Sequence, residues 1–372
     1  MRLHLITSTT ISLLALASTT RLIGTARAVD YGPPPGMGGG GASTNIAFRR
    51  LDLASDQNGV GKVTDPKLIN SWGLVISGSK LVVANAGSGA AGTYSSAGRP
   101  LSTIEIPAPG GGDADSTDVA LNVSPKSFGM QGPRNRKVGA TYLLVTENGT
   151  IAAWNRSIDP TSAVTMVDNS GAGSVYKSVA VARTSDGPML FAADFGKGVV
   201  EIYDGNFNPV NSFTDADLAN ANYVPFGLRV LNGHLFVTFA LKSSPSDDDE
   251  TAGPGLGYVD EFDLSGNFVR RVASQGTLNA PWGLALAPRN LGPFSGALLV
   301  GNFGDGTINA FDPATGGFLG QLGDEQGNVI SIEGLWGLAF SGGGKGRNLY
   351  YAAGPGDEAH GVIGVLLPVK KR

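Results

Sequence analysis

Residues 281–320 read PWGLALAPRNLGPFSGALLVGNFGDGTINAFDPATGGFLG, and this stretch decides the fold. It holds four short apolar blocks, at residues 282–286, 297–302, 307–312 and 316–320. Glycine, proline, asparagine and aspartate separate each block from the next. Short apolar blocks bounded by such turn formers are typical of β-strands. The stretch therefore predicts four consecutive strands joined by tight turns.

The first of these blocks belongs to a phrase that recurs along the chain, an aromatic residue followed by glycine and an apolar residue. The phrases contain Trp72, Phe128, Phe226, Trp282 and Trp336, and Tyr176-Lys177-Ser178-Val179 fills the one gap. The steps from residue 72 to 128, 178, 226, 282 and 336 are 56, 50, 48, 56 and 54 residues. Such a period is typical of propellers and solenoids. Six units of four strands predict an all-β fold, a six-bladed β-propeller with four-stranded antiparallel blades.

The composition agrees with a folded chain that has many turns. Glycine accounts for 56 of the 372 residues, and only 16% of the residues are charged. Hydrophobic residues at 41% and a net charge of −4 exclude disorder driven by charge repulsion. The glycines also lack the three-residue period of collagen. Crowded inner strands and tight turns account for the glycine, so we predict a single propeller domain over residues 45–372.

Charge and cysteine content exclude several classes of function. The sequence pI is about 5.4 and no basic cluster is present, so nucleic acid is not an expected partner. The chain has no cysteine, which excludes disulfides, thiol catalysis and zinc-thiolate sites. Burial between neighbouring blades must therefore stabilise the fold.

The N-terminus has the pattern of a secretory signal peptide. Arg2 supplies the basic region, residues 11–17 (ISLLALA) the apolar region, and Ala26-Arg27-Ala28 a cleavage site. We predict a signal peptide over residues 1–28 and a flexible Pro/Gly-rich linker over residues 29–44. No apolar segment reaches the roughly 20 residues of a membrane span. The expected product is secreted, or periplasmic in a Gram-negative bacterium, and its mature chain has no membrane span.

Two short motifs, Pro281-Trp-Gly-Leu-Ala and Ile308-Asn-Ala-Phe-Asp312, resemble the NHL-type six-bladed propeller. Longer phrases, at residues 53–59, 64–73, 199–204 and 281–319, resemble a group of exported, largely uncharacterised propeller proteins. The similarity covers residues 47 to about 365 and implies the fold without implying an activity. Many members of the group end in a membrane-sorting tail. This chain ends at Arg372 without one, so a soluble product is expected.

Polar residues follow the second strand of several predicted blades and suggest a metal site. Asn85, Glu147, Asp194 and Asn302 occur there, in the contexts NAGSG, ENGT, DFGKG and NFGDG. Loops at one mouth of a propeller converge, and four such oxygen donors suit Ca²⁺. Calcium-dependent lactonases and phosphotriesterases with related propellers resemble this arrangement, although fold is a poor guide to reaction. The alternative is that these residues form turns, because Asn, Asp and Gly tolerate left-handed backbone.

Catalytic candidates are few. His360, with Asp357 and Glu358 beside it, lies in a polar loop of the predicted last blade, whereas His234 lies in a predicted hairpin turn. No Gly-x-Ser-x-Gly elbow or phosphate loop occurs in a suitable setting. Asp204, Asp263 and Asp312 each end a predicted third strand, which is typical of a structural turn.

An insertion in the fourth unit, residues 243–254, carries the acids Asp247, Asp248, Asp249 and Glu250. It is either a solvated acidic loop or a loop that overhangs the mouth and shapes access to it. Two functions follow from the sequence. The first is a module that binds a small molecule or an extracellular protein through the loops at one channel mouth. The alternative is a calcium-dependent hydrolase or lactonase with the metal in the central channel, so the sequence leaves open whether the protein is an enzyme.

Overall fold

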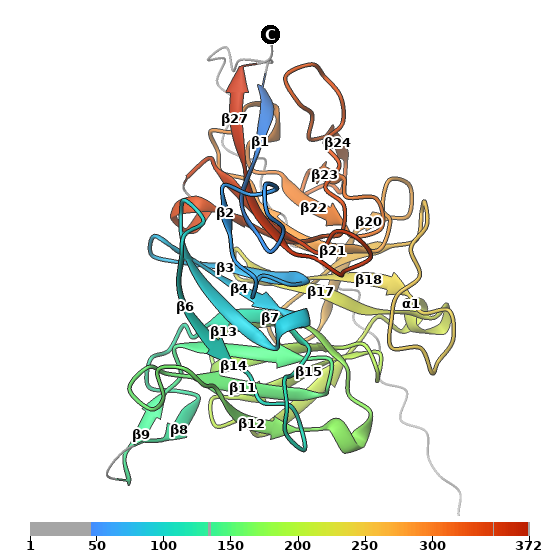
Figure 1. Ribbon diagram of the computed structural model, residues 1–372. Helices are drawn as coiled ribbons and strands as arrows, with labels where there is room; N and C mark the ends of the chain where they lie inside the picture. Colours follow the sequence, from blue (N-terminus) through green and yellow to red (C-terminus); the bar gives the residue numbers. More distant parts are fainter. Residues whose placement is uncertain (1–45, 133–134, 345, 371–372) are drawn as a thin grey trace, which may run out of the picture. The chain divides into compact units, whose positions relative to one another are not determined.

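The computed structural model describes residues 46–132, 135–344 and 346–370 (Figure 1). These residues form six sheets arranged as the blades of a β-propeller, which confirms the predicted fold class. The predicted signal peptide and linker, residues 1–28 and 29–44, lie outside the described residues and stay predictions.

Each blade is an antiparallel sheet in which the strands follow one another from the channel outward. Blades 1 to 3 consist of β3 (Ser71–Ser77), β4 (Lys80–Asn85), β5 (Ala90–Ser95) and β6 (Pro100–Glu105); β7 (Ser116–Leu121), β10 (Tyr142–Thr146), β11 (Thr150–Trp154) and β12 (Val164–Asp168); and β13 (Tyr176–Thr184), β14 (Gly187–Asp194), β15 (Val199–Asp204) and β16 (Pro209–Phe213). Blades 4 to 6 consist of β17 (Tyr223–Leu231), β18 (His234–Leu241), β19 (Tyr258–Phe262) and β20 (Phe268–Ser274); β21 (Pro281–Leu286), β22 (Leu298–Asn302), β23 (Ile308–Phe311) and β24 (Phe318–Gln321); and β25 (Leu335–Phe340), β26 (Leu349–Ala353), β27 (Val362–Lys370) and β1 (Ile46–Ser55).

The two ends of the described chain close the ring of blades. The inner strands contact one another in order, and β25 of the last blade meets β3 of the first. The outer strand of blade 6 is β1, which pairs antiparallel with β27 from Ile46–Lys370 to Ser55–Val362. Figure 1 shows β1 in blue beside β27 in red. A short strand, β2 (Val63–Thr64), extends this sheet in parallel with β1.

Apolar side chains fill the space between every pair of neighbouring blades. Phe191 and Phe239 belong to the cluster between blades 3 and 4, and Leu299 and Leu349 to the cluster between blades 5 and 6. All four side chains are buried. Burial of this kind is the main favourable term in folding, and it stabilises a ring that has no disulfide.

The glycine after each inner aromatic residue marks a close approach between inner strands. A Cβ on Gly227 would lie 2.1 Å from the carbonyl oxygen of Trp282, and one on Gly283 would lie 2.5 Å from that of Trp336. Any side chain there would overlap the neighbouring backbone. Part of the glycine excess is therefore a requirement of the channel.

The second blade differs from the predicted repeat. The phrase around Phe128 was expected to start its inner strand, but that strand is β7, in which Thr117 and Asp118 stand at the repeat positions. Phe128 instead precedes an inserted hairpin of β8 (Gly129–Gln131) and β9 (Lys137–Gly139). Its ring is buried against Phe207 of blade 3, with a centroid distance of 5.3 Å. Phe128 and the glycine after it therefore match the repeated phrase in sequence, although Phe128 packs between blades and not in the channel.

The aspartates that end third strands organise turns, as predicted. Asp204 Oδ1 accepts hydrogen bonds from the backbone N–H groups of Asn206 and Asn208. Asp263 and Asp312 accept equivalent bonds from the residues that follow them. A short helix, α1 (Ala216–Asn220), leads into blade 4 and is capped by the Asp215 side chain.

Candidate functional site

Six residues, one from each inner strand, occupy equivalent positions around the channel. In five blades the preceding residue is the first of its inner strand, as Ser71 opposite Asn85 and Tyr176 opposite Asp194 show, and in blade 4 the strand starts two residues earlier, at Tyr223. The six residues are Trp72, Thr117, Lys177, Phe226, Trp282 and Trp336. Four of them are aromatic, and Lys177 is the one charged member.

The four aromatic side chains form a central aromatic cluster that fills the channel at this level. The rings of Trp72 and Trp336 stack with centroids 3.6 Å apart, and Trp282 meets Trp336 edge-on at 5.7 Å. Phe226 contacts Trp336 at the same distance of 5.7 Å. All four are buried. A ligand that enters at this mouth would therefore meet an apolar floor beside the Lys177 side chain.

Lys177 lies against this cluster with its side chain fully buried, at 0% exposure. Its Nζ is 5.3 Å from the ring centroids of both Trp72 and Phe195, a distance that suits attraction between a cation and an aromatic face. The same ammonium forms an ion pair with Glu147, which follows β10 of blade 2. Burial alone would lower the pKa of Lys177, but the nearby carboxylates of Glu147, Glu250 and Asp249 raise it above its ordinary value. Lys177 is therefore a fixed positive charge.

The insertion at residues 243–254 reaches this mouth. Asp249 Oδ1 lies 3.2 Å from Lys177 Nζ, although the Asp249 side chain is itself 86% exposed. Of the two interpretations of the insertion, the structure thus supports a loop that overhangs the mouth. We call residues 243–254 the acidic loop.

Two further carboxyls complete the mouth. Glu358, in the loop between β26 and β27, accepts a hydrogen bond of 3.3 Å from Asn70 Nδ2. Burial, followed by repulsion from Glu147, raises the pKa of Glu358 to about 7. Burial also raises the pKa of Glu250, in the acidic loop, to about 7. We call Glu147, Lys177, Asp249, Glu250 and Glu358 together the acidic mouth.

The four residues predicted as calcium ligands do not share one environment. Asn85 and Asn302 end their second strands and Asp194 does likewise, but the equivalent position of blade 2 is Thr146, opposite Ser116. Glu147 lies one position further along, which brings it to Lys177. This offset explains why Glu147 alone of the four belongs to the acidic mouth.

The other three have partners in their own turns or neighbouring strands. Asn85 Oδ1 accepts a hydrogen bond from Ser71 Oγ, and Asp194 Oδ1 accepts bonds from the N–H groups of Val175 and Lys197. Asn302 Nδ2 donates to the carbonyl oxygen of Thr277 at 2.8 Å. These contacts agree with the turn interpretation, and calcium binding by the four residues stays a prediction. Among the residues that the structure describes, no group of three or more His, Cys, Asp and Glu side chains could hold a metal ion.

Of the predicted catalytic candidates, only one belongs to the acidic mouth. His360 Nδ1 lies 2.8 Å from Asp56 Oδ2, so His360 joins the last blade to the segment after β1. Asp357 and Glu358 both adopt left-handed backbone, with φ of 52° and 64°, and the Asp357 side chain is exposed. Only Glu358 takes part in the acidic mouth. His234 lies beside Glu261 at 3.0 Å, in the turn that starts β18.

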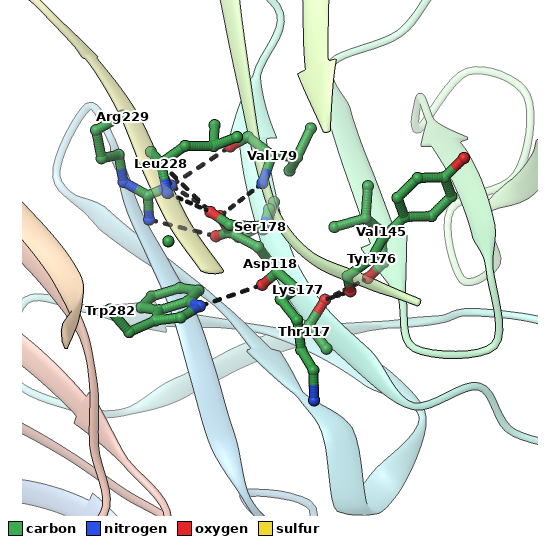
Figure 2. A network of polar contacts seen from close by, with 12 residues as sticks. Thr117, Asp118, Val145, Tyr176, Lys177, Ser178, Val179, Leu228, Arg229 and Trp282 are labelled. Atoms are coloured by element: carbon green, nitrogen blue, oxygen red, sulfur yellow. Dashed lines mark hydrogen bonds and ion pairs between the residues drawn. The ribbon is translucent and has the colours of Figure 1, made fainter. Parts of the chain in front are cut away.

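Asp118 organises a buried polar network that sequence reasoning missed (Figure 2). It occupies the position that is glycine in four other blades, and its Oδ2 accepts hydrogen bonds from Ser178 Oγ at 2.7 Å and the Val179 N–H at 3.0 Å. Arg229 Nη1 donates to the same oxygen at 2.8 Å. Figure 2 shows the Lys177 side chain leading away from this network. Asp118 thus links blades 2, 3 and 4, and the one hint in the sequence is that Asp stands in a series of glycines.

The chain is similar in sequence to two viral proteins. No family model matches it. An uncharacterized protein of Acanthamoeba polyphaga mimivirus is 32% identical over 295 residues, which cover 77% of this chain and 72% of that protein. A second uncharacterized protein of the same virus is 31% identical over 328 residues, which cover 85% and 84%. No helix among the described residues is long and apolar enough to cross a membrane.

Solved structures share the architecture. A catalytically inactive virginiamycin B lyase from Staphylococcus aureus with quinupristin aligns with a TM-score of 0.52 and 13% identity, over 87% of this chain and 100% of that one. A structural genomics protein of unknown function from Bacteroides thetaiotaomicron aligns with a TM-score of 0.53 and 10% identity, over 87% and 76%. At such identities the likeness shows the fold alone. The chain belongs to the family of the two mimivirus proteins, and its described residues form a six-bladed β-propeller.

Proposed function

We propose that the protein is an exported binding module that captures a positively charged group at the acidic mouth. The group belongs to a small molecule or to an extracellular protein. The relation between Asp249 and Lys177 carries this proposal. A loop that is inserted in one blade lies over the mouth, and its ion pair with Lys177 is made by an exposed carboxylate. Such a contact is weak and can open, because exposed ion pairs contribute only about 0–1 kcal/mol.

The charge of the acidic mouth selects the class of ligand. Four carboxyls, those of Glu147, Asp249, Glu250 and Glu358, surround the single ammonium of Lys177. Negative charge is therefore in excess when the carboxyls are ionised. The raised pKa values of Glu250 and Glu358 have the same origin, since burial and neighbouring carboxylates disfavour their charged forms. A bound amine or guanidinium would offset this charge, and the aromatic cluster would contact its apolar part.

Isothermal titration of the purified mature protein tests the proposal, with spermidine and a lysine-rich peptide as probes at low and high salt. We expect binding at low salt that weakens as salt screens the charges. The E358Q variant should lose affinity. The matched control is D186N, because Asp186 lies in the turn at the opposite end of β13 and β14. Failure of both probes to bind, or equal affinities for E358Q and the wild type, would overturn the proposal.

The alternative, a calcium-dependent hydrolase or lactonase, is tested with the same protein. The excess of negative charge would also attract a divalent cation, so Ca²⁺ is titrated beside the organic probes. Binding of Ca²⁺ that E358Q and N302A both weaken would support the alternative. Binding of spermidine that N302A leaves unchanged supports the binding module.

A further inference from the structure

A second buried lysine, Lys242, lies directly after β18 and beneath the start of the acidic loop. Only 5% of the residue is exposed. It lines a surface cavity of about 200 Å³ at the rims of blades 3 and 4. Gly196, Lys197, Ala219, Asn222 and Pro245 line the same cavity. The amine of Lys242 therefore combines burial with access from a space that fits a small molecule.

The hydrogen bonds of Lys242 go to backbone carbonyl groups and not to carboxylates. Its Nζ donates to the backbone carbonyl oxygens of Phe195 and Gly196, both at 3.2 Å. A neutral amine has two N–H donors and one lone pair, whereas an ammonium has three donors. Among the described residues, Lys242 takes part in no ion pair, unlike Lys177 and Lys197. Two acceptors are enough for both N–H groups of the neutral amine, and an ammonium would have a third N–H without a protein acceptor in the described part of the chain.

The charged groups around Lys242 act in both directions. Burial has the largest effect and lowers the pKa of Lys242, and the Lys177 ammonium lowers it further. Both lysines share the ring of Phe195, with each Nζ 5.3 Å from its centroid. Asp247 and Asp248 of the acidic loop, and Asp194 of β14, oppose these effects and raise the pKa. Because burial has the largest effect, the sum of these contributions places the pKa of Lys242 below its ordinary value.

Lys197, the other lysine of this cavity, provides a contrast. Its Nζ lies 2.9 Å from Glu201 Oε1, and its interactions with Glu201 and Asp194 outweigh its burial, so its pKa is raised. Two amines beside one cavity therefore differ in the fraction that is free to react. A desolvated lysine next to another cation is the usual setting of an amine nucleophile.

We propose that Lys242 is a nucleophilic amine that takes a small aldehyde from this cavity and holds it as an imine. The lone pair of Nζ adds to the carbonyl carbon, and a C=N bond forms as the carbonyl oxygen leaves as water with the two N–H protons. No oxidant or reductant is needed. A proton taken up from solvent gives the imine one N–H, for which the carbonyl oxygen of Phe195 or Gly196 is the acceptor. This site uses no side chain of the acidic mouth except through the charge of Lys177.

Reductive trapping of the folded mature protein tests the assignment. The protein is treated with acetaldehyde and sodium cyanoborohydride between pH 6 and 9, and peptide mass spectrometry gives the rate at every lysine. We expect Lys242 to be modified several-fold faster than Lys197 at neutral pH, with a profile displaced to lower pH. Lys177 should react slowest, because Glu147 and Asp249 hold it protonated. Equal rates for Lys242 and Lys197 at every pH, or modification of Lys177 as fast as Lys242, would overturn the proposal.

Two variants separate reactivity from access. In D247N/D248N the two loop carboxylates that raise the pKa of Lys242 are neutral, so its rate at fixed pH should increase while that of exposed Lys62 stays constant. A role confined to packing predicts no such increase. K242R should lose the adduct and keep the circular dichroism spectrum of the wild type. An unchanged rate in D247N/D248N would contradict the electrostatic argument, even if Lys242 reacted.

Discussion

Lys177 Nζ lies 3.2 Å from Asp249 Oδ1, so an inner strand of blade 3 holds down a loop of blade 4. The carboxylate is largely exposed while the ammonium is buried. We expect D249N to release the acidic loop and to lower the free energy of unfolding by no more than about 1 kcal/mol. Limited proteolysis of residues 243–254 and urea unfolding measure the two effects. Cleavage rates equal to the wild type would show that Asp249 does not hold the loop.

The pair of Lys177 and Glu147 should behave differently, because its ammonium is fully buried. K177M leaves the carboxyls of the mouth without their cation, and we expect a loss of about 3–5 kcal/mol in urea unfolding. The double variant K177M/E147Q should recover part of this loss, since it removes both charges. K197M is the matched control, because Lys197 is one-third exposed and forms its pairs at the surface. Equal losses for K177M and K197M would contradict a central role for Lys177.

Stability should fall as the pH rises through the titration of Glu250 and Glu358. The ordinary pKa of a glutamate is 4.5, and in the folded protein both values are about 7. Between these values the folded protein binds more protons than the unfolded chain, so these groups destabilise the fold as pH increases. Melting temperatures from pH 5 to 8 should therefore decline less steeply in E250Q/E358Q than in the wild type. Parallel curves would show that neither carboxyl titrates in this window.

Asp118 is expected to be as sensitive to substitution as Lys177. D118A leaves the Arg229 guanidinium without its carboxylate and takes the acceptor from Ser178, so we expect a loss of about 3–5 kcal/mol. D118N should cost less, because an amide oxygen can still accept hydrogen bonds. D186N, at an exposed turn, is the control. A loss below about 1 kcal/mol for D118A in chemical denaturation would refute this role.

Asn302 distinguishes a turn from a metal ligand. Its side-chain amide donates to the carbonyl oxygen of Thr277 and to Thr307 Oγ1, so N302A should cost about 0.5–1.5 kcal/mol by removing these hydrogen bonds. The loss should be the same in calcium and in a chelator when the role is structural. Urea titrations in both buffers measure it. A loss that appears only with calcium would support the predicted ring of ligands instead.

The repeat of an aromatic residue followed by glycine predicted most of the blades. In these blades the aromatic side chain fills the channel, and the glycine leaves room for the backbone of the neighbouring inner strand. The repeat failed in blade 2, where Thr117 and Asp118 replace those two residues and Phe128 repeats the phrase elsewhere. The acidic mouth was beyond local patterns, since Glu147, Lys177 and Glu358 come from three different blades. The signal that was present was Lys177 itself, a charge at an aromatic position of the repeat.

The pairing of β1 with β27 also determines when the last blade can form during synthesis. Among the described strands β1 is made first, and it remains without its antiparallel partner until Val362–Lys370 has been made. A chain that crosses a membrane in an unfolded state would meet the same requirement on the far side. A truncated chain that lacks β27 therefore cannot complete the last blade or close the ring. Its unpaired strand edge would be a template for aggregation.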